Sequence, residues 1–195
     1  MQNRLLDAIS HDRAPHAILI SGPEGSGKRE LARRCAALFC LDEDAPERLV
    51  SCPNYYEIGE STVKVDDIRT LLASAAMQGF NGGRRAFVFV NAQLMSTQIQ
   101  NTLLKTLEEP APSTLICLVS EQPSRLLATI RSRCQALRLP LPAEAEALAW
   151  LSPQVRGLAA ATLLHLAHGA PLRALELADP ERLAQRDKLF AGFVA

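Results

Sequence analysis

One short segment near the start of the sequence has the residue types and spacing of a phosphate-binding loop. Residues 22–28 read GPEGSGK, which fits the pattern G-x-x-x-x-G-K, and they lie between an apolar run and an amphipathic stretch. The glycines allow successive backbone N–H groups to turn toward an anion, the start of the following helix adds positive potential, and the lysine can reach the outer phosphates. The candidate phosphate-binding residues are therefore Gly22, Gly25, Gly27 and Lys28. The alternative is an ordinary glycine-rich turn between a strand and a helix.

The groups that would hold a metal ion beside this loop are missing from their expected places. Arg29 follows the lysine, where a serine or threonine hydroxyl would contact Mg²⁺, and a guanidinium has a fixed positive charge and no acceptor. The apolar run 86–90 leads into Asn91 and Ala92 instead of an acidic residue. Phosphoryl transfer depends on positioning and charge neutralisation, so these losses predict little or no nucleotide hydrolysis and no metal site. The alternative is that a different acid serves, because the apolar run 115–120 is followed by Glu121.

A second candidate for chemistry lies near residue 133, in a stretch rich in arginine. No acidic residue lies between Glu121 and Glu144, whereas this stretch holds the arginines at 125, 131, 133 and 138. Ser132, Arg133 and Cys134 follow a predicted helical stretch, 124–130, and precede a predicted strand, so the Arg133 guanidinium is expected at the edge of the domain. An arginine supplied to a nucleotide bound by a neighbouring molecule accelerates hydrolysis roughly 10³–10⁵-fold. Arg133 is therefore a candidate catalytic residue in trans, and the alternative is a solvated basic face.

Apolar runs predict the strands of a parallel sheet. Short, nearly continuous apolar runs are typical of strands buried on both faces, and they occur at 16–20, 86–90, 115–119 and 136–139, with a further strand expected near 55–58. Helical periodicity separates these runs, and after the triplet Pro140-Leu141-Pro142 only helices are expected, over 144–151, about 155–167, 172–178 and 180–193. The sequence therefore predicts an α/β fold with a mostly parallel sheet over residues 1–141 and a small all-α domain over 142–195.

Local signals mark the ends of the helices in the first part. Asp66 is the expected N-cap of a helix that ends near Gly79 and the turn 81–83. Thr97 and Gln100 have the spacing of a capping box and open a helix that stops before Pro110. The paired carboxylates 108–109 at the end of that helix are expected to be solvated or paired with the lysine at 105.

Composition excludes several classes of protein. The chain has 195 residues, 48% of them hydrophobic, and a formal net charge of zero, which excludes a disordered or polycationic protein. Five cysteines, an odd number, favour free thiols in a reducing compartment, and no apolar run approaches the length of a membrane span. A cytoplasmic location is therefore predicted. The histidines and cysteines show no spacing typical of metal ligands.

Three motifs taken together resemble the bacterial clamp-loader AAA+ subunits. They are the glycine loop, the run NTLLKTLEEP at 101–110 and the run LLATIRSRC at 126–134. Within that family the sequence is similar to the delta-prime group of DNA polymerase III, over residues 13–177. The resemblance implies a Rossmann-like AAA+ P-loop domain followed by a helical lid. The missing hydroxyl and acids agree with the delta-prime group rather than with the hydrolysing gamma/tau group.

The resemblance also implies a function in DNA replication. A delta-prime-like subunit is expected to have no ATPase or polymerase activity of its own, while belonging to a DNA-directed DNA polymerase holoenzyme. Arg133 would be presented to ATP bound by a neighbouring gamma/tau subunit, and the delta subunit, the sliding clamp and primed DNA are the further partners expected. No cofactor is expected to be required by this chain itself. The alternatives are an active ATPase of the gamma/tau type and a nucleotide- or DNA-binding adaptor outside replication.

Three features depart from the pattern of that family. Its members commonly have a four-cysteine zinc module after the first helix, but only Cys40 and Cys52 lie in that region, so no zinc site is expected. In the lid, Leu172 stands where the family usually has arginine, and Arg173 lies one residue later, about 100° further round a helix. Nucleotide sensing from the lid is therefore not expected. The sequence ends at Ala195, before the collar domain of full-length members, so we expect it to be a fragment.

Overall fold

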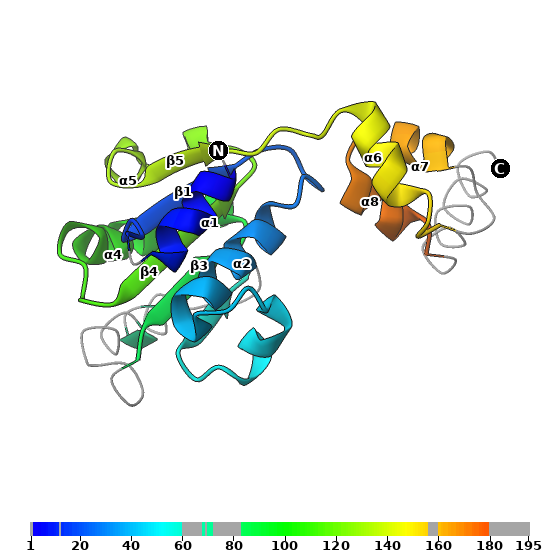
Figure 1. Ribbon diagram of the computed structural model, residues 1–195. Coiled ribbons are helices and arrows are strands. Elements are labelled where there is room, and N and C mark those ends of the chain that lie inside the picture. Colours follow the sequence, from blue (N-terminus) through cyan, green and yellow to red (C-terminus); the bar gives the residue numbers. More distant parts are fainter. Residues whose placement is uncertain are drawn as a thin grey trace. The chain divides into compact units, whose positions relative to one another are not determined.

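The computed structural model describes residues 2–11, 13–59, 68, 70–71, 83–155 and 160–179 (Figure 1). The chain divides into two compact units. The first consists of residues 1–21 and 28–138, and the second of residues 22–27 and 139–195. The helices expected over 66–79 and 180–193, and the turn at 81–83, fall outside the described residues apart from Ile68, Thr70, Leu71 and residue 83.

A five-stranded sheet forms the centre of the first unit. Its strands lie in the order β2-β3-β4-β1-β5, and all four pairings between them are parallel. The strands are β1 (Ala17–Ser21), β2 (Tyr55–Ile58), β3 (Arg85–Phe89), β4 (Thr114–Ser120) and β5 (Gln135–Arg138). Every residue of β3 and β4 is buried, as the apolar runs predict. All five predicted strands are present, with ends that differ by one residue from several expected bounds.

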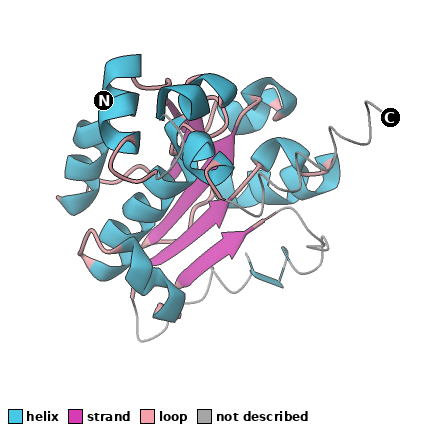
Figure 2. Ribbon diagram, turned by 90° about the vertical axis from the view of Figure 1, so that its right-hand side faces the viewer, coloured by secondary structure: helices cyan, strands magenta, loops and turns pink. Residues whose placement is uncertain are grey.

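Helices cover both faces of this sheet (Figure 2). On one face, strands β1, β3 and β4 contribute Leu19, Phe87 and Leu118 to a core. Leu103 and Leu107 of the helix over residues 97–108 pack in the same core. Side chains alternate along a strand, so the neighbouring residues of these strands face the opposite layer. The helical elements of the unit are α1 (Gln2–Ser10), α2 (Lys28–Leu41), η1 (Pro46–Ser51), η3 (Ala92–Leu94), α4 (Thr97–Glu108), η4 (Pro123–Arg125) and α5 (Ala128–Arg131). Helix α2 contacts β1, β3 and β4, and α1 packs on α2.

The second unit has its own small core. Helices α6 (Glu144–Leu151), α7 (Ala160–Leu166) and α8 (Pro171–Leu177) contact one another, and Leu151, Leu163 and Leu164 are buried between them. Gly169, between α7 and α8, has a φ of +82° and donates its backbone N–H to the Leu164 carbonyl at 2.9 Å. A glycine in this conformation ends a helix without a Cβ penalty.

Two details of the first unit differ from the sequence-based predictions. Ser96, not Thr97, caps α4, because its hydroxyl accepts a hydrogen bond from the Ile99 backbone N–H at 3.3 Å. The helix expected over 124–130 is instead divided into η4 and the short α5, with Leu126 in an extended conformation between them. Leu126 is buried in the core of the sheet. Packing of this side chain therefore overrides the helical spacing of the local sequence.

Candidate functional site

The glycine loop connects β1 to α2 and depends on glycine at two positions. Gly25 has a φ of +70° and Gly27 a φ of +87°, conformations that other residues rarely adopt. A Cβ on Gly25 would also lie 2.9 Å from the Cβ atoms of both Ala170 and Arg173. Within the second unit, the start of α8 is thus packed directly against the loop. A larger residue at position 25 would strain the backbone, and it would also push the loop away from the start of α8.

Arg173 belongs to the same contact. Its Nη1 donates to Oε2 of Glu24 in the loop at 2.7 Å. The residue that lies one position after the usual arginine of the family therefore reaches the loop, but its charge is matched by a carboxylate of this chain. Both side chains are largely exposed, so the pair is worth about 1 kcal/mol or less.

Lys28 is the first residue of α2, and its buried ammonium is paired with a carboxylate of the same chain. The side chain is only 6% exposed, and its Nζ lies 3.7 Å from Oε1 of Glu121, directly after β4. The Glu121 backbone N–H donates to Oε1 of Gln93 at 3.3 Å, which connects the ends of β3 and β4. The lysine that would reach a phosphate in a working loop is therefore paired with a carboxylate of this chain.

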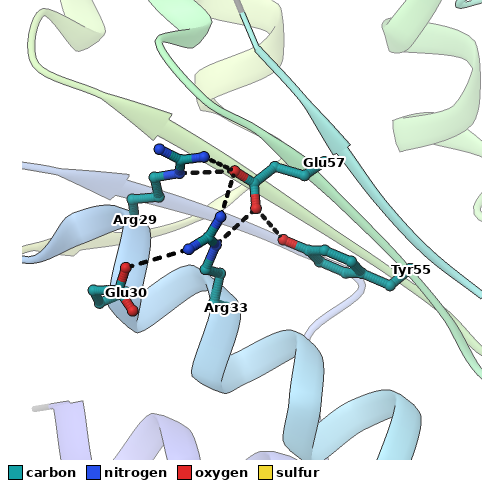
Figure 3. A network of polar contacts seen from close by, with 5 residues as sticks. All are labelled: Arg29, Glu30, Arg33, Tyr55 and Glu57. Carbon is teal, nitrogen blue, oxygen red and sulfur yellow. Dashed lines mark hydrogen bonds and ion pairs between the residues drawn. The ribbon is translucent and has the colours of Figure 1, made fainter. Parts of the chain in front are cut away.

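Arg29 stands where a metal-binding hydroxyl would be, and it is turned toward β2 (Figure 3). Its Nε donates to Oε1 of Glu57 at 2.7 Å, and the Arg33 Nε donates to Oε2 of the same carboxylate at 2.8 Å. Tyr55 donates its hydroxyl to Glu57 as well, and Glu30 pairs with Arg33 at 3.5 Å. Glu57 is thus the acceptor for three side chains from α2 and β2.

The electrostatics of this network follow from its geometry. Burial alone would raise the pKa of Glu57, but hydrogen bonds from Arg33, Tyr55 and Arg29 outweigh burial and lower it. Burial and the Glu57 carboxylate together raise the pKa of Tyr55, and the hydrogen bond to Glu57 raises the pKa of Arg33. Glu57 is therefore ionised at neutral pH and fixes Arg29 in its orientation.

The end of β3 offers no acid to a metal ion or a water molecule. Asn91 lies just beyond the strand with a φ of +55°, and Ala92 is fully buried at the start of η3. An amide brings no charge to Mg²⁺ and cannot deprotonate water. Among the residues that the structure describes, no three His, Cys, Asp or Glu side chains gather as a metal site. The five cysteines are free thiols.

Arg133 lies at the surface just after α5. Its Nη1 donates to the Thr129 carbonyl at 3.0 Å, and its Nη2 lies 2.8 Å from Oε1 of Glu108 at the end of α4. The arginine side chain is 36% exposed and the Glu108 side chain 50%. Glu108 is therefore exposed to solvent, as expected, and its ion-pair partner is Arg133 rather than Lys105. None of these contacts of Arg133 is to the phosphate loop, so the two candidate sites are held by separate sets of contacts.

Gln100 is a buried residue that sequence reasoning missed as a support of this segment. Its Nε2 donates to the Met95 carbonyl at 3.0 Å, and its Oε1 accepts the Leu127 backbone N–H at 2.8 Å. The side chain therefore connects the start of α4 to the residue that precedes α5. The available signal was a lone polar residue at helical spacing from Leu103 and Leu107, on the buried face of α4.

Apolar packing completes the support of the arginine motif. Ile130 is fully buried, and Cys134 packs in the same core. Burial raises the pKa of the Cys134 thiol to about 11, so it is an uncharged packing group at neutral pH. Ser132 donates its hydroxyl to the Thr129 carbonyl at 3.0 Å. The motif residues on either side of Arg133 therefore anchor the turn, while the guanidinium lies at the surface.

A parallel sheet in this strand order, with a glycine loop and lysine between β1 and α2, defines an α/β fold of the AAA+ P-loop class. Solved structures agree: a gamma subunit-related protein of DNA polymerase III from Thermotoga maritima has a TM-score of 0.67 at 24% identity, covering 90% of this chain and 59% of that one. The RuvB Holliday junction branch migration motor of the same organism has a TM-score of 0.59 at 19% identity, covering 91% and 58%. At these identities the likeness concerns the fold alone.

Sequence comparison gives the family. The model of the family described as DNA polymerase III, delta subunit, matches residues 1–143, and the chain belongs to this family. DNA polymerase III subunit delta' of Pseudomonas aeruginosa is 37% identical, over 91% of this chain and 60% of that protein. The corresponding subunit of Escherichia coli is 32% identical, over 95% and 61%. The chain thus spans about three fifths of the length of these curated relatives.

One more relative and one property of the helices bear on the chain. Subunit gamma/tau of DNA polymerase III from Mycoplasma genitalium is 30% identical, over 68% of this chain and 24% of that protein. Within the described residues, none of the helices combines the length and the hydropathy that crossing a bilayer requires.

Proposed function

We propose that this chain acts as a non-hydrolysing, delta-prime-like subunit of the DNA polymerase III clamp loader. In this function it donates Arg133 to ATP bound by a neighbouring gamma/tau-type subunit, and so couples hydrolysis there to loading of the sliding clamp on primed DNA. The observation that carries the proposal is the contrast between Arg133, whose partly exposed side chain pairs with the half-exposed Glu108, and Lys28, whose side chain is only 6% exposed and pairs with Glu121. The delta' relatives support the subunit assignment.

The energetics favour transfer of Arg133 to an external phosphate. Its pair with Glu108 is solvent-exposed, and such pairs contribute about 1 kcal/mol or less. An arginine that stabilises the charge of a phosphoryl-transfer transition state contributes about 4–7 kcal/mol to the barrier. A triphosphate in a neighbouring subunit would therefore compete well against Glu108 for the guanidinium.

The chain's own phosphate loop is poorly equipped for the same reaction. Arg29 replaces the hydroxyl that would hold Mg²⁺, and its guanidinium is bound to Glu57. Asn91 and Ala92 follow β3 where acids would bind the metal and direct water. ATP hydrolysis in the complex is accordingly assigned to the neighbouring subunit, and no cofactor of this chain is required.

The proposal assigns two domains to the chain. An AAA+ P-loop domain over residues 1–141 carries Arg133, and a helical lid over 142–195 follows it. The partners proposed are the gamma/tau and delta subunits, with the clamp and the DNA reached through the complex. The chain spans about three fifths of the length of its delta' relatives, so its place in such a complex is part of this proposal.

The test is ATP turnover in a clamp loader reconstituted with its clamp and primed DNA. Arg133→Ala should lower turnover by roughly 10³-fold or more, while the complex still assembles by size-exclusion chromatography. Arg131→Ala is the matched control, because it removes a neighbouring exposed arginine and should leave turnover near the wild-type value. Unchanged turnover in the Arg133 variant would falsify the proposal. Mg²⁺-dependent turnover by this chain alone, abolished by Lys28→Ala, would instead favour an ATPase of the gamma/tau type.

A further inference from the structure

A cavity of about 310 Å³ lies in the first unit, at the end of the sheet where the parallel strands begin. Of the residues that line it, His16 directly precedes β1, Arg84 directly precedes β3, and Thr114 is the first residue of β4. The phosphate loop follows the opposite, carboxyl end of β1. Neither a residue of that loop nor Arg133 is among the described residues that line the cavity, so it is a separate feature of the molecule.

The lining of this cavity combines apolar surface with two basic residues. Phe39, Pro110 and Pro112 supply the apolar surface. Arg84 and His16 have side-chain N–H groups that can donate hydrogen bonds. No acidic residue is among the described residues that line the cavity. A cavity of this volume, with a few polar side chains beside an apolar wall, is typical of a pocket for an organic ligand, and here the charge complements an anion.

Arg84 is held in place at this cavity by contacts with α2 and the residue that follows it. Its guanidinium lies over the Phe39 ring, 5.6 Å from the ring centroid, which is a favourable cation–π arrangement. Its Nη1 donates to the Phe39 carbonyl at 3.4 Å and to Oδ1 of Asp42 at 2.8 Å. The ring and the carbonyl therefore position the guanidinium, while the carboxylate of Asp42 matches its charge.

The carboxylate of Asp42 is a partner that another anion can replace. The Asp42 side chain is 75% exposed, and ion pairs with so exposed a member contribute little to stability. Asp42 is not among the residues that line the cavity. A carboxylate that enters the cavity can therefore take its place at Arg84, and the planar guanidinium can hold it by two parallel hydrogen bonds.

We propose that this cavity is a binding site for a carboxylate carried on an apolar, aromatic body. Arg84 binds the carboxylate in exchange for Asp42, and Phe39 with the prolines at 110 and 112 contacts the apolar part. Two sources offer this chemistry, a small aromatic acid and a peptide in which an acidic residue stands beside an aromatic one. The proposal rests on neither the phosphate loop nor Arg133, so it is independent of the function proposed above.

The experiment titrates the chain with N-acetyl-phenylalanine and follows the backbone amide signals by NMR. This acid should bind at least about tenfold more tightly than N-acetyl-phenylalanine amide, which has the same ring without the charge, and than acetate, which has the charge without the ring. The shifted signals should include those of Ala111, Ser113 and Thr114, which line the cavity. N-acetyl-aspartyl-phenylalanine amide distinguishes the sources: comparable binding supports a peptide ligand, and much weaker binding supports a small acid.

Two variants assign the binding to Arg84. Arg84→Met removes the charge but keeps an unbranched side chain over Phe39, and it should bind the acid at least about tenfold more weakly, whereas Arg48→Met makes the same change in net charge at an exposed residue outside the cavity.

Asp42→Asn removes the competing carboxylate and should bind the acid about threefold or more tightly than wild type. Asparagine tolerates the φ of +54° at this position, and Glu47→Gln is the control for the change in net charge. Thermal melting checks the folding of each variant, and Asp42→Asn tests the site even if Arg84→Met does not fold. Equal affinity for the acid and its amide, absence of binding by both, or unchanged affinity in Asp42→Asn or in a folded Arg84→Met would each overturn the proposal.

Discussion

The phosphate loop and the Arg133 turn differ in where their charges find partners. At the loop, Lys28 is paired with Glu121, and Arg29 is fixed by Glu57. At the turn, backbone and apolar contacts hold the chain, while the guanidinium of Arg133 is paired, among the described residues, with the Thr129 carbonyl and the exposed carboxylate of Glu108. The comparison teaches that a buried ammonium, or a group of arginines sharing one carboxylate, supports the fold, whereas a guanidinium held by one carbonyl and one exposed carboxylate is available to another molecule.

Removing the acceptor of the loop-side network should give the largest loss of stability. Glu57→Ala leaves Arg29 and Arg33 without their shared carboxylate and is expected to lower the free energy of unfolding by about 3 kcal/mol. Chemical denaturation measures the change. Glu30→Ala is the control, because Glu30 makes a more exposed pair with Arg33 and its loss should cost about 1 kcal/mol or less. Equal effects of the two substitutions would show that the Glu57 network is not a distinct support.

The contribution of Glu57 should also depend on pH. Its folded-state pKa is lowered, so its contribution to stability is fully present above the unfolded-state pKa of about 4.3 and is lost as the pH falls through the folded-state value. The difference in unfolding free energy between wild type and Glu57→Gln should therefore be constant near neutrality and shrink below about pH 4. A difference that grows on acidification would contradict the assigned direction of the pKa shift.

The support of the arginine turn should give an intermediate effect. Gln100→Ala leaves the Leu127 backbone N–H without its acceptor and is expected to destabilise the protein by about 1–3 kcal/mol. The same substitution should lower ATP turnover of a reconstituted complex, because Arg133 is then less well positioned. Gln98→Ala, on the same helix but exposed, is the control for denaturation and turnover. A destabilised variant with full turnover would mean that Gln100 supports only the fold.

The smallest effect is expected at the surface pair of the turn. Glu108→Gln should change the free energy of unfolding by less than about 1 kcal/mol, since both side chains are substantially exposed. Turnover in the complex should be retained, because the triphosphate replaces this carboxylate as the partner of Arg133. Denaturation and turnover measured on one preparation test both statements. A loss of several kcal/mol in the free energy of unfolding would show that the Arg133–Glu108 pair supports the fold, as the Glu57 network does. The contrast between the two regions would then be removed.

Features that depend on neighbouring residues could be predicted from the sequence, whereas contacts between residues far apart along the chain could not. The glycine loop and the buried strands are local patterns, and the sequence indicated both. The pairs Arg29–Glu57 and Lys28–Glu121 join residues far apart along the chain, and no local pattern specifies such partners. The division of the predicted helix over 124–130 has a similar cause, because Leu126 is fixed by the sheet core and not by its neighbours in sequence.

The most direct test of the contrast compares Arg133→Ala with Lys28→Ala in the same reconstituted clamp loader. ATP turnover per complex is measured with clamp and primed DNA present, after assembly of both variants has been verified. The account predicts a loss of roughly 10³-fold for Arg133→Ala and a change of less than about twofold for Lys28→Ala. The reverse order, or equal losses, would contradict it.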